Sequence, residues 1–249
     1  MTSLADKRVI VTGGTSGIGY AAAVAMIGEG AEVIITGQDT QRVEDAANAL
    51  GDAATGIVAP SQVPGSADRI AAAAKDRFGG VDVVFANAGV TWPGPLGEIT
   101  ADAVADQFAV NFTGPLLTIQ ALVPLISKGG SVIVTTSSLD RAGMPGMAVY
   151  SASKAALRSL VRTFAAELAE RGIRVNSIAP GPIDTPIYAK LGMPDDQLQG
   201  MSELILTKVP QGRFGKPEEI AGAVLFLASD ASSYMMGEEI TIDGGWTNI

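Results

Sequence analysis

The sequence predicts an α/β domain in which a parallel sheet of seven strands is covered by helices on both faces. Short apolar runs alternate with helix-period segments along the whole chain, and a glycine-rich turn follows the first run. Regular alternation of this kind is typical of a doubly wound parallel sheet. No linker, repeat or low-complexity tract divides the 249 residues. We therefore predict a single domain over residues 1–249, which this length permits.

The seven predicted strands are short and rich in β-branched residues. Most of them lack polar alternation, which is typical of strands buried on both faces. They occupy residues 9–11, 33–36, 55–59, 81–86, 131–136, 174–178 and 239–242.

Helical periodicity separates the strands, at 17–29, 40–50, 66–78, 101–126, 150–171 and 217–228. Pro115 lies inside the fourth of these segments and should kink or restart that helix just after Asn111. The helix at 150–171 carries apolar and small residues on more than one face. Such a helix must bury those faces, either against a second copy of the chain, which we predict, or wholly inside one protomer.

Composition excludes several classes of function. The net charge of −9 argues against nucleic acid binding, which requires basic patches. The chain has no cysteine and no histidine, so disulfides, thiolate zinc sites, imidazole-ligated metals and a Ser-His-Asp triad are excluded. We predict no metal. No apolar run reaches the roughly 18 residues of a membrane span, and the first strand leaves no room for a signal peptide, so we expect a cytoplasmic protein without membrane contact.

The glycine-rich turn at residues 12–19 reads TGGTSGIG and stands between a strand and a helix. Glycines let the backbone approach phosphates closely, and the helix N-terminus supplies N–H donors, so this turn predicts a pyrophosphate site. The spacing differs from the commonest dinucleotide pattern, and an ordinary tight turn is the alternative. The candidate residues are Gly13, Thr15, Ser16, Gly17, Ile18 and Gly19.

Tyr150 and Lys154 are four residues apart and lie on one face of a predicted helix. A free phenol has a pKa of about 10, and a nearby ammonium should lower it. The pair could then exchange a proton with a carbonyl or alcohol oxygen. A surface Tyr and Lys on an amphipathic helix is the alternative when the pair is taken alone.

Further motifs give the glycine turn and the Tyr-Lys pair a common interpretation. They are Asn87-Ala88-Gly89, Asn111, Ser137 thirteen residues before Tyr150, NSIAPGPIDT at 176–185, RFGKPEEI at 213–220 and DGGW at 243–246. In this order and spacing they resemble the short-chain dehydrogenase/reductase family over nearly the whole chain. The resemblance implies a Rossmann-like fold, a homotetramer and an oxidoreductase that interconverts a ketone and a secondary alcohol.

The resemblance also implies roles for individual residues. Tyr150 is the general acid or base, Ser137 donates to the substrate oxygen, Asn111 completes a proton relay, and Lys154 lowers the pKa of Tyr150 and binds the nicotinamide ribose. The resemblance places Asn87, Ala88, Gly89, Pro180, Gly181, Ile183 and Thr185 around the cofactor, together with Tyr150, Lys154 and the glycine turn.

The choice of cofactor depends on the end of the second strand. Relatives that prefer NAD usually have Asp where Gly37 stands, and relatives that prefer NADP often have Arg where Gln38 stands or a basic residue where Ser16 stands. This chain has neither. Gly37 should leave space for a phosphate and Gln38 could bind either form, so NADP(H) is slightly favoured over NAD(H). The family's adenine-reading Asp is replaced by Pro60-Ser61, which points to an altered adenine pocket.

The substrate is expected to be a small carbonyl or alcohol compound with a hydrophobic or aryl group. Apolar, flexible side chains are typical of a roomy pocket, although ordinary packing would also explain them. They are Trp92, Leu139, Met144, Met147, Tyr188 and Met193. Residues 185–210, rich in Gly and Pro, are implied to form a lid within the domain, with an ordinary surface excursion as the alternative.

Two enzyme alternatives and one of another class remain open. A relative reduces 3-oxoacyl groups on acyl carrier protein, an acidic partner, for which Lys128, Arg171 and Arg174 are possible contacts. A redox-independent enzyme on this fold is conceivable. A nucleotide-sensing binding module without turnover is the third hypothesis, since the fold alone does not determine the function.

Overall fold

The computed structural model describes residues 4–189 and 194–249. Seven parallel strands form one sheet in the order β3-β2-β1-β4-β5-β6-β7. The predicted doubly wound, Rossmann-like fold is confirmed. The strands are β1 (Arg8–Val11), β2 (Glu32–Gly37), β3 (Ala54–Val58), β4 (Val81–Ala86), β5 (Ile126–Thr135), β6 (Arg174–Pro180) and β7 (Glu239–Ile242).

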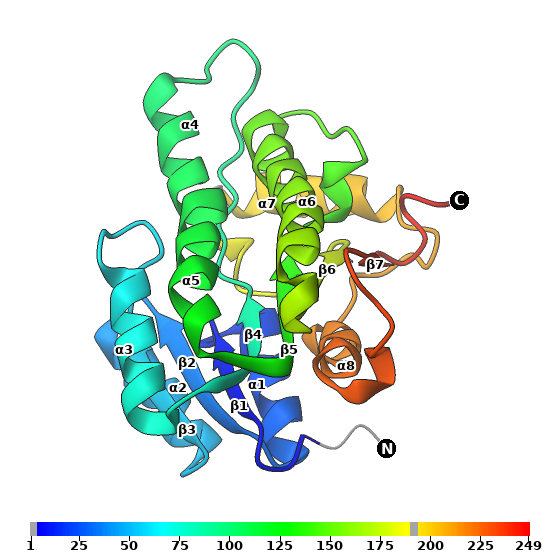
Figure 1. Ribbon diagram of the computed structural model, residues 1–249. Coiled ribbons are helices and arrows are strands. Elements are labelled where there is room, and N and C mark those ends of the chain that lie inside the picture. The colour runs from blue at the N-terminus through cyan, green and yellow to red at the C-terminus, as the bar shows by residue number, and fades with distance from the viewer. Residues whose placement is uncertain (1–3, 190–193) are drawn as a thin grey trace.

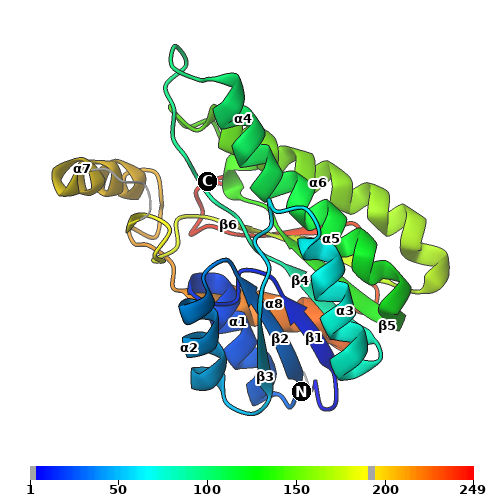
Figure 2. The same cartoon turned by 90° about the vertical axis from the view of Figure 1, so that its left-hand side faces the viewer.

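Helices cover both faces of the sheet (Figures 1 and 2). One layer consists of α1 (Gly17–Gly28), α2 (Thr40–Leu50) and α8 (Pro217–Ala228), and the other of α3 (Ser66–Phe78), α5 (Gly114–Leu122) and α6 (Ala148–Leu168). A further helix, α4 (Ala101–Phe108), lies beside α6.

The two cores explain why the strands read as continuous apolar runs. Successive side chains of a strand point to opposite faces. In β1, Val9 and Val11 pack in the core beneath α1 and α8, whereas Ile10 packs in the core on the other face. Both faces of the strand are therefore buried, and the sequence shows no polar alternation at these positions.

The long helical segment is interrupted where Pro115 predicts. A π-helical turn (Ala109–Thr113) separates α4 from α5, and Pro115 lies in the first turn of α5. Proline has no N–H to donate, and π-turns of this kind often mark functional sites. By length and composition Ala101–Leu125 would suit a membrane span. In the fold its α5 part packs against α3, and its α4 part and the π-turn pack against α6.

One apolar face of α6 is buried within the protomer, through Leu157, Leu160, Val161, Ala165 and Leu168. The small residues of the other face are not covered in the same way, since Ala155 and Ala166 are exposed. Burial inside the protomer therefore accounts for one face only, and the homotetramer stays a prediction.

Within the described part of the segment at 185–210, the helix α7 (Asp195–Leu206) stands away from the sheet (Figure 2). Ile205 on this helix is buried. Because the segment is an excursion between β6 and α8, it has the position that a lid requires, and its closing role stays a prediction.

Candidate active site

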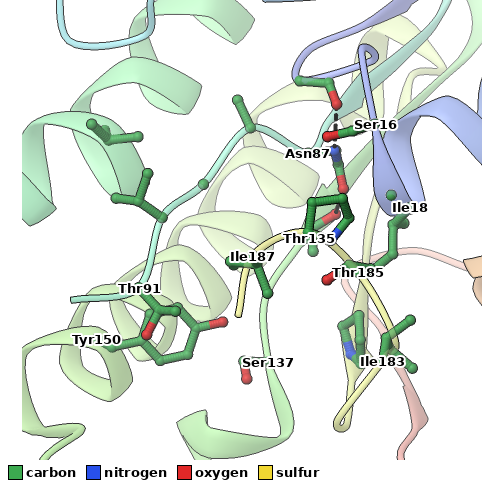
Figure 3. A pocket seen from close by; sticks show the side chains of 18 of the residues that line it. Ser16, Ile18, Asn87, Thr91, Thr135, Ser137, Tyr150, Ile183, Thr185 and Ile187 are labelled. Atoms are coloured by element: carbon green, nitrogen blue, oxygen red, sulfur yellow. Dashed lines mark hydrogen bonds between the residues drawn. The ribbon is translucent and has the colours of Figure 1, made fainter. Parts of the chain in front are cut away.

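The candidate site lies at the carboxyl ends of the strands, where the strand order reverses between β1 and β4. Open α/β sheets bind ligands at such a switch point. A cavity of about 430 Å³ extends from the glycine turn to Tyr150. In Figure 3, Ser16 and Ile18 lie at one end of this cavity and Tyr150 and Ser137 at the other.

The glycine turn needs its glycines for packing as well as for conformation. Gly13 and Gly17 have φ of 65° and 55°, which side chains rarely adopt. A Cβ atom at Gly19 would lie 2.3 Å from the carbonyl oxygen of Gly13. Within the described residues, Ser16 gives the start of α1 no side-chain cap, so the first N–H groups of that helix remain available to an anion. These features fit a pyrophosphate.

Asn87 ties three strand ends together beside the glycine turn. Its backbone N–H donates to Thr12 Oγ1 over 3.0 Å, its side-chain amide donates to the carbonyl oxygen of Thr12 over 3.2 Å, and Thr135 Oγ1 donates to Asn87 Oδ1. The Asn-Ala-Gly motif therefore fixes the floor of the cavity. The sequence did not indicate this role for Thr12.

Asn111 is fully buried in the π-turn and makes three hydrogen bonds. Its Oδ1 accepts from Val90 N over 2.8 Å, and its Nδ2 donates to Val90 O over 2.9 Å and to Ser153 Oγ over 3.1 Å. Ser153 in turn donates to the carbonyl oxygen of Tyr150. Asn111 thus holds α6 and the Asn-Ala-Gly loop in register, and its side chain lies behind the cavity. Ser153 was missed because a serine inside a helix carries no distinctive pattern.

Lys154 is buried and donates to the carbonyl oxygen of Thr135 over 2.9 Å. Burial lowers the pKa of this ammonium to about 8. Gly89 makes room for it, since a Cβ atom at Gly89 would lie 3.2 Å from Lys154 Nζ and 3.4 Å from Asn111 Oδ1. The motif glycine therefore brings two predicted catalytic side chains close together.

Tyr150 differs from the sequence expectation in the direction of its pKa shift. Burial raises the pKa of its phenol, and a hydrogen bond with Ser137 offsets this only in part. The ammonium of Lys154 is 5.9 Å from the ring centroid and is directed to Thr135. The pKa of Tyr150 is therefore raised by the loss of water around the phenol, and Lys154 is not one of the groups that shift it.

Ser137 lies at the end of β5 and begins the 3-10 turn η3 (Ser138–Asp140). Its hydroxyl oxygen accepts from Leu139 N over 3.2 Å. A hydroxyl that accepts still has its own proton to donate. Figure 3 shows Ser137 and Tyr150 directed into the same space.

Most of the predicted site residues line this cavity. The exceptions are Gly19, which packs behind the turn, and Asn111. Met193 lies outside the described residues. The predicted residues that line it are Gly13, Thr15, Ser16, Gly17, Ile18, Gly37, Gln38, Asn87, Ala88, Gly89, Trp92, Ser137, Leu139, Met144, Met147, Tyr150, Lys154, Pro180, Gly181, Ile183, Thr185 and Tyr188.

The end of the cavity near β2 differs from the expectation in two ways. The space beside Gly37 is filled, because a Cβ atom there would lie 2.7 Å from side-chain carbons of both Thr15 and Val43. The carboxylate of Asp39 caps α2 by accepting from Arg42 N over 2.9 Å. Arg42 itself is exposed and lines the cavity. Arg42 was not predicted from the sequence, although a basic residue in the first turn of the helix after β2 could have indicated it.

Tyr188 joins the segment after β6 to the site. Its ring packs edge-on against Phe214 with centroids 5.5 Å apart. Burial raises the pKa of its phenol, and the neighbouring Tyr150 and Asp184 add to the shift. Among the described residues, no group of three or more acidic side chains is arranged to hold a metal ion.

The chain is similar to known proteins along most of its length. A family model described as enoyl-(acyl carrier protein) reductase matches residues 13–247. The chain is 40% identical to oxidoreductase asL5 of Sarocladium schorii, over 99% of this chain and 98% of that protein. It is 37% identical to the 3-oxoacyl-[acyl-carrier-protein] reductase FabG of Thermotoga maritima, over 97% and 98% of the two chains.

The fold has close neighbours among solved structures. A short-chain type dehydrogenase/reductase from Mycobacterium marinum superposes with a TM-score of 0.91 at 31% identity, covering 100% of this chain and 98% of that one. Matches of this length and identity establish kinship as well as fold. The chain belongs to the short-chain dehydrogenase/reductase family of oxidoreductases acting on CH–OH and C=O groups.

Proposed function

We propose that the protein interconverts a ketone and a secondary alcohol, with NADP(H) as cofactor and a hydrophobic or aryl carbonyl compound as substrate. The observation that carries this proposal is the meeting of the Ser137 and Tyr150 side chains in the cavity that the glycine turn also lines. A bound nicotinamide dinucleotide would supply or accept the hydride at the substrate carbon.

Tyr150 handles the matching proton at the substrate oxygen. It gives this proton to a carbonyl in reduction and takes it from an alcohol in oxidation. Because burial raises its pKa, Tyr150 holds its proton at neutral pH and is prepared to act as the acid. Ser137, whose oxygen already accepts from Leu139, can direct its proton to the oxygen on which charge develops.

Three residues near β2 favour NADP(H). Gly37 offers no carboxylate to repel a 2′-phosphate, and the carboxylate of Asp39 is engaged as a helix cap. Arg42 lines the same end of the cavity. Guanidinium groups bind phosphate oxygens through paired N–H donors, so Arg42 replaces the basic residues that this chain lacks at Ser16 and Gln38.

Apolar side chains around the reacting end support a hydrophobic substrate. Leu139 and Met147 are buried there, whereas Trp92 is 43% exposed at the cavity wall. Ile187, which was not predicted from the sequence, points in from the segment after β6 (Figure 3). Few charged groups face this end, so an aryl or alkyl group suits it better than a charged one.

The 3-oxoacyl-[acyl-carrier-protein] reductase alternative is supported by the Thermotoga maritima relative. Of the three basic residues considered for docking, Arg174 is buried and donates to the carbonyl oxygens of Leu227 and Ser229, so it stabilises the fold. Lys128 and Arg171 are exposed. The net charge of −9 is unfavourable for an acidic protein partner, so a small molecule is favoured.

The proposal is tested by a fluorescence titration with NADPH and NADH, followed by turnover of a panel of aryl and alkyl ketones. We expect saturable binding, tighter for NADPH, and turnover that falls by at least about 100-fold in Tyr150→Phe while nucleotide binding persists. Binding without turnover by the unaltered protein would favour the nucleotide-sensing module. Activity that needs no nicotinamide would refute the oxidoreductase proposal.

A further inference from the structure

Four charged side chains form a cluster behind the turn that Ser137 begins. Asp140 ends this turn, Glu239 begins β7, and Arg141 and Arg158 approach both carboxyl groups. The side chain of Asp140 is 0% exposed and that of Glu239 is 5% exposed. Two buried carboxyl groups at one place rarely both remain ionised.

The two carboxyl groups have unequal partners. Glu239 accepts from Arg141 Nη2 and lies 3.2 Å from Arg158 Nε. Asp140 lies 3.7 Å from Arg141 Nε and 3.9 Å from Arg158 Nε, and within residues 4–189 and 194–249 neither of its oxygens accepts a hydrogen bond from an N–H or hydroxyl donor. Its one hydrogen-bonding neighbour among these residues is the carboxyl group of Glu239, with which it can share a proton. An ionised Asp140 would be a buried anion without a donor, which is costly. The neutral form is therefore favoured, and burial beside Glu239 raises the pKa of Asp140 to about 7.

The neighbouring threonine ties the carboxyl pair to the Ser137 turn. Thr136 Oγ1 lies 2.8 Å from the carbonyl oxygen of Ile178 and 2.6 Å from Glu239 Oε2, and Ser177 Oγ lies 3.4 Å from the same carboxyl oxygen. Glu239 is therefore held against the strand ends from which the Ser137 turn begins.

The cluster is connected to the proposed reaction at both ends of the Ser137 turn. Thr136 precedes Ser137, and Asp140 N donates to the carbonyl oxygen of Ser137 over 3.0 Å. The charge of an ionised Asp140 also raises the pKa of Tyr150. The position of Ser137 and the charge near Tyr150 thus depend on whether the buried pair of Asp140 and Glu239 holds a proton.

We propose that Asp140 is a positioning residue for proton transfer by Tyr150, acting through the proton that it shares with Glu239. This role rests on the oxidoreductase function proposed above. When Asp140 is neutral, the carboxyl pair holds the Ser137 turn and adds no negative charge that would raise the pKa of Tyr150. When Asp140 ionises, its charge keeps the proton on Tyr150, which slows alcohol oxidation more than ketone reduction. The charged or titratable groups facing Asp140 are Glu239, Arg141, Arg158 and Tyr150.

The shared proton can be measured without any substrate. Carbon NMR of protein with labelled aspartate side chains should show one carboxyl signal that titrates near pH 7 and is missing in Asp140→Asn. In Glu239→Gln, which removes the neighbouring negative charge, the same signal should titrate at lower pH. Asp106→Asn, which alters an exposed carboxylate on α4, is the matched control and should leave the signal in place. An Asp140 signal that titrates in the ordinary range near pH 4 overturns the proposal.

The positioning role is tested by pH profiles of turnover in both directions. Relative to the unaltered enzyme, Asp140→Asn should shift the rise of alcohol oxidation to lower pH by at least about half a pH unit, through kcat more than KM. A structural role alone would lower the rate equally at every pH, and this outcome overturns the proposal. Thermal melting of both variants separates misfolding from the predicted shift. If the unaltered enzyme turns over no carbonyl compound, the proposed function fails, whereas an unshifted profile in an active variant refutes the role of Asp140 alone.

Discussion

Lys154 donates to the carbonyl oxygen of Thr135 over 2.9 Å while only 3% of its surface is exposed. One neutral acceptor replaces little of the hydration that a buried ammonium loses. Burial accordingly lowers the pKa of Lys154 to about 8. A cation held in this way costs stability, which is typical of residues retained for function.

Lys154→Met should therefore stabilise the fold and abolish turnover. The pKa of Lys154 is lower in the folded protein than in the unfolded chain. The free-energy cost of burying its charge is therefore fully present below about pH 8 and disappears as the pH rises toward 10.5. We expect a gain of about 1 kcal/mol at pH 7 that shrinks at higher pH, measured by thermal melting. Lys75→Met, at an exposed position of α3, is the control and should show no such pH dependence. A loss of stability at pH 7 would contradict the prediction.

Asn111→Ala should cost stability as well as activity. It removes the partner of Val90 N, Val90 O and Ser153 Oγ inside the protein. Unsatisfied buried groups cost about 1–3 kcal/mol each when no water replaces the partner, so we expect a loss of about 3 kcal/mol in urea unfolding. Asn48→Ala, on the exposed surface of α2, should change little. Full stability in the Asn111 variant would show that water fills the π-turn.

Arg42→Ala should weaken NADPH binding by about tenfold and leave NADH binding unchanged, since only NADPH carries a 2′-phosphate. The two dissociation constants, measured at equal ionic strength, give this ratio directly. Arg162→Ala removes an equal charge from an exposed site on α6 and serves as the control for net charge. An equal loss for both nucleotides would place Arg42 elsewhere than at the phosphate.

The fold could be predicted from the sequence because its signals are local. Strands buried on both faces, such as β2 with Val33, Ile34 and Ile35, have continuous apolar runs in the sequence. Pro115 marked the interruption before α5 because proline acts on its own helix. The features that the sequence did not predict depend on side chains that only the fold brings together. Asp140 and Glu239 are 99 positions apart, and the direction of the Tyr150 pKa shift depends on burial, which motif spacing does not report.

A last prediction concerns Arg8 and Asp82, which lie near the amino ends of β1 and β4, whereas the cavity lies at the carboxyl ends of the strands. Arg8 Nε donates to Asp82 Oδ2 over 2.7 Å, and Arg8 Nη2 donates to Asp82 Oδ1 over 3.0 Å. Burial alone would raise the pKa of Asp82, but the hydrogen bonds from Arg8 outweigh it and hold this pKa below its usual value. The pair joins the starts of β1 and β4, which lie side by side in the sheet.

A depressed carboxyl pKa contributes stability that is present above the unfolded value of about 3.8 and is lost as the pH falls through the folded one. Asp82→Asn should therefore destabilise the protein by about 1–2 kcal/mol at pH 7, with the difference closing below pH 3. Glu32→Gln breaks the exposed pair that Glu32 forms with Arg77, and it should cost under about 0.5 kcal/mol because solvent screens exposed charges. Urea unfolding at both pH values measures these differences. The cavity lies at the opposite ends of the strands, so kcat should stay unchanged in both variants. A fall in kcat for Asp82→Asn would show that strain at β1 reaches the glycine turn.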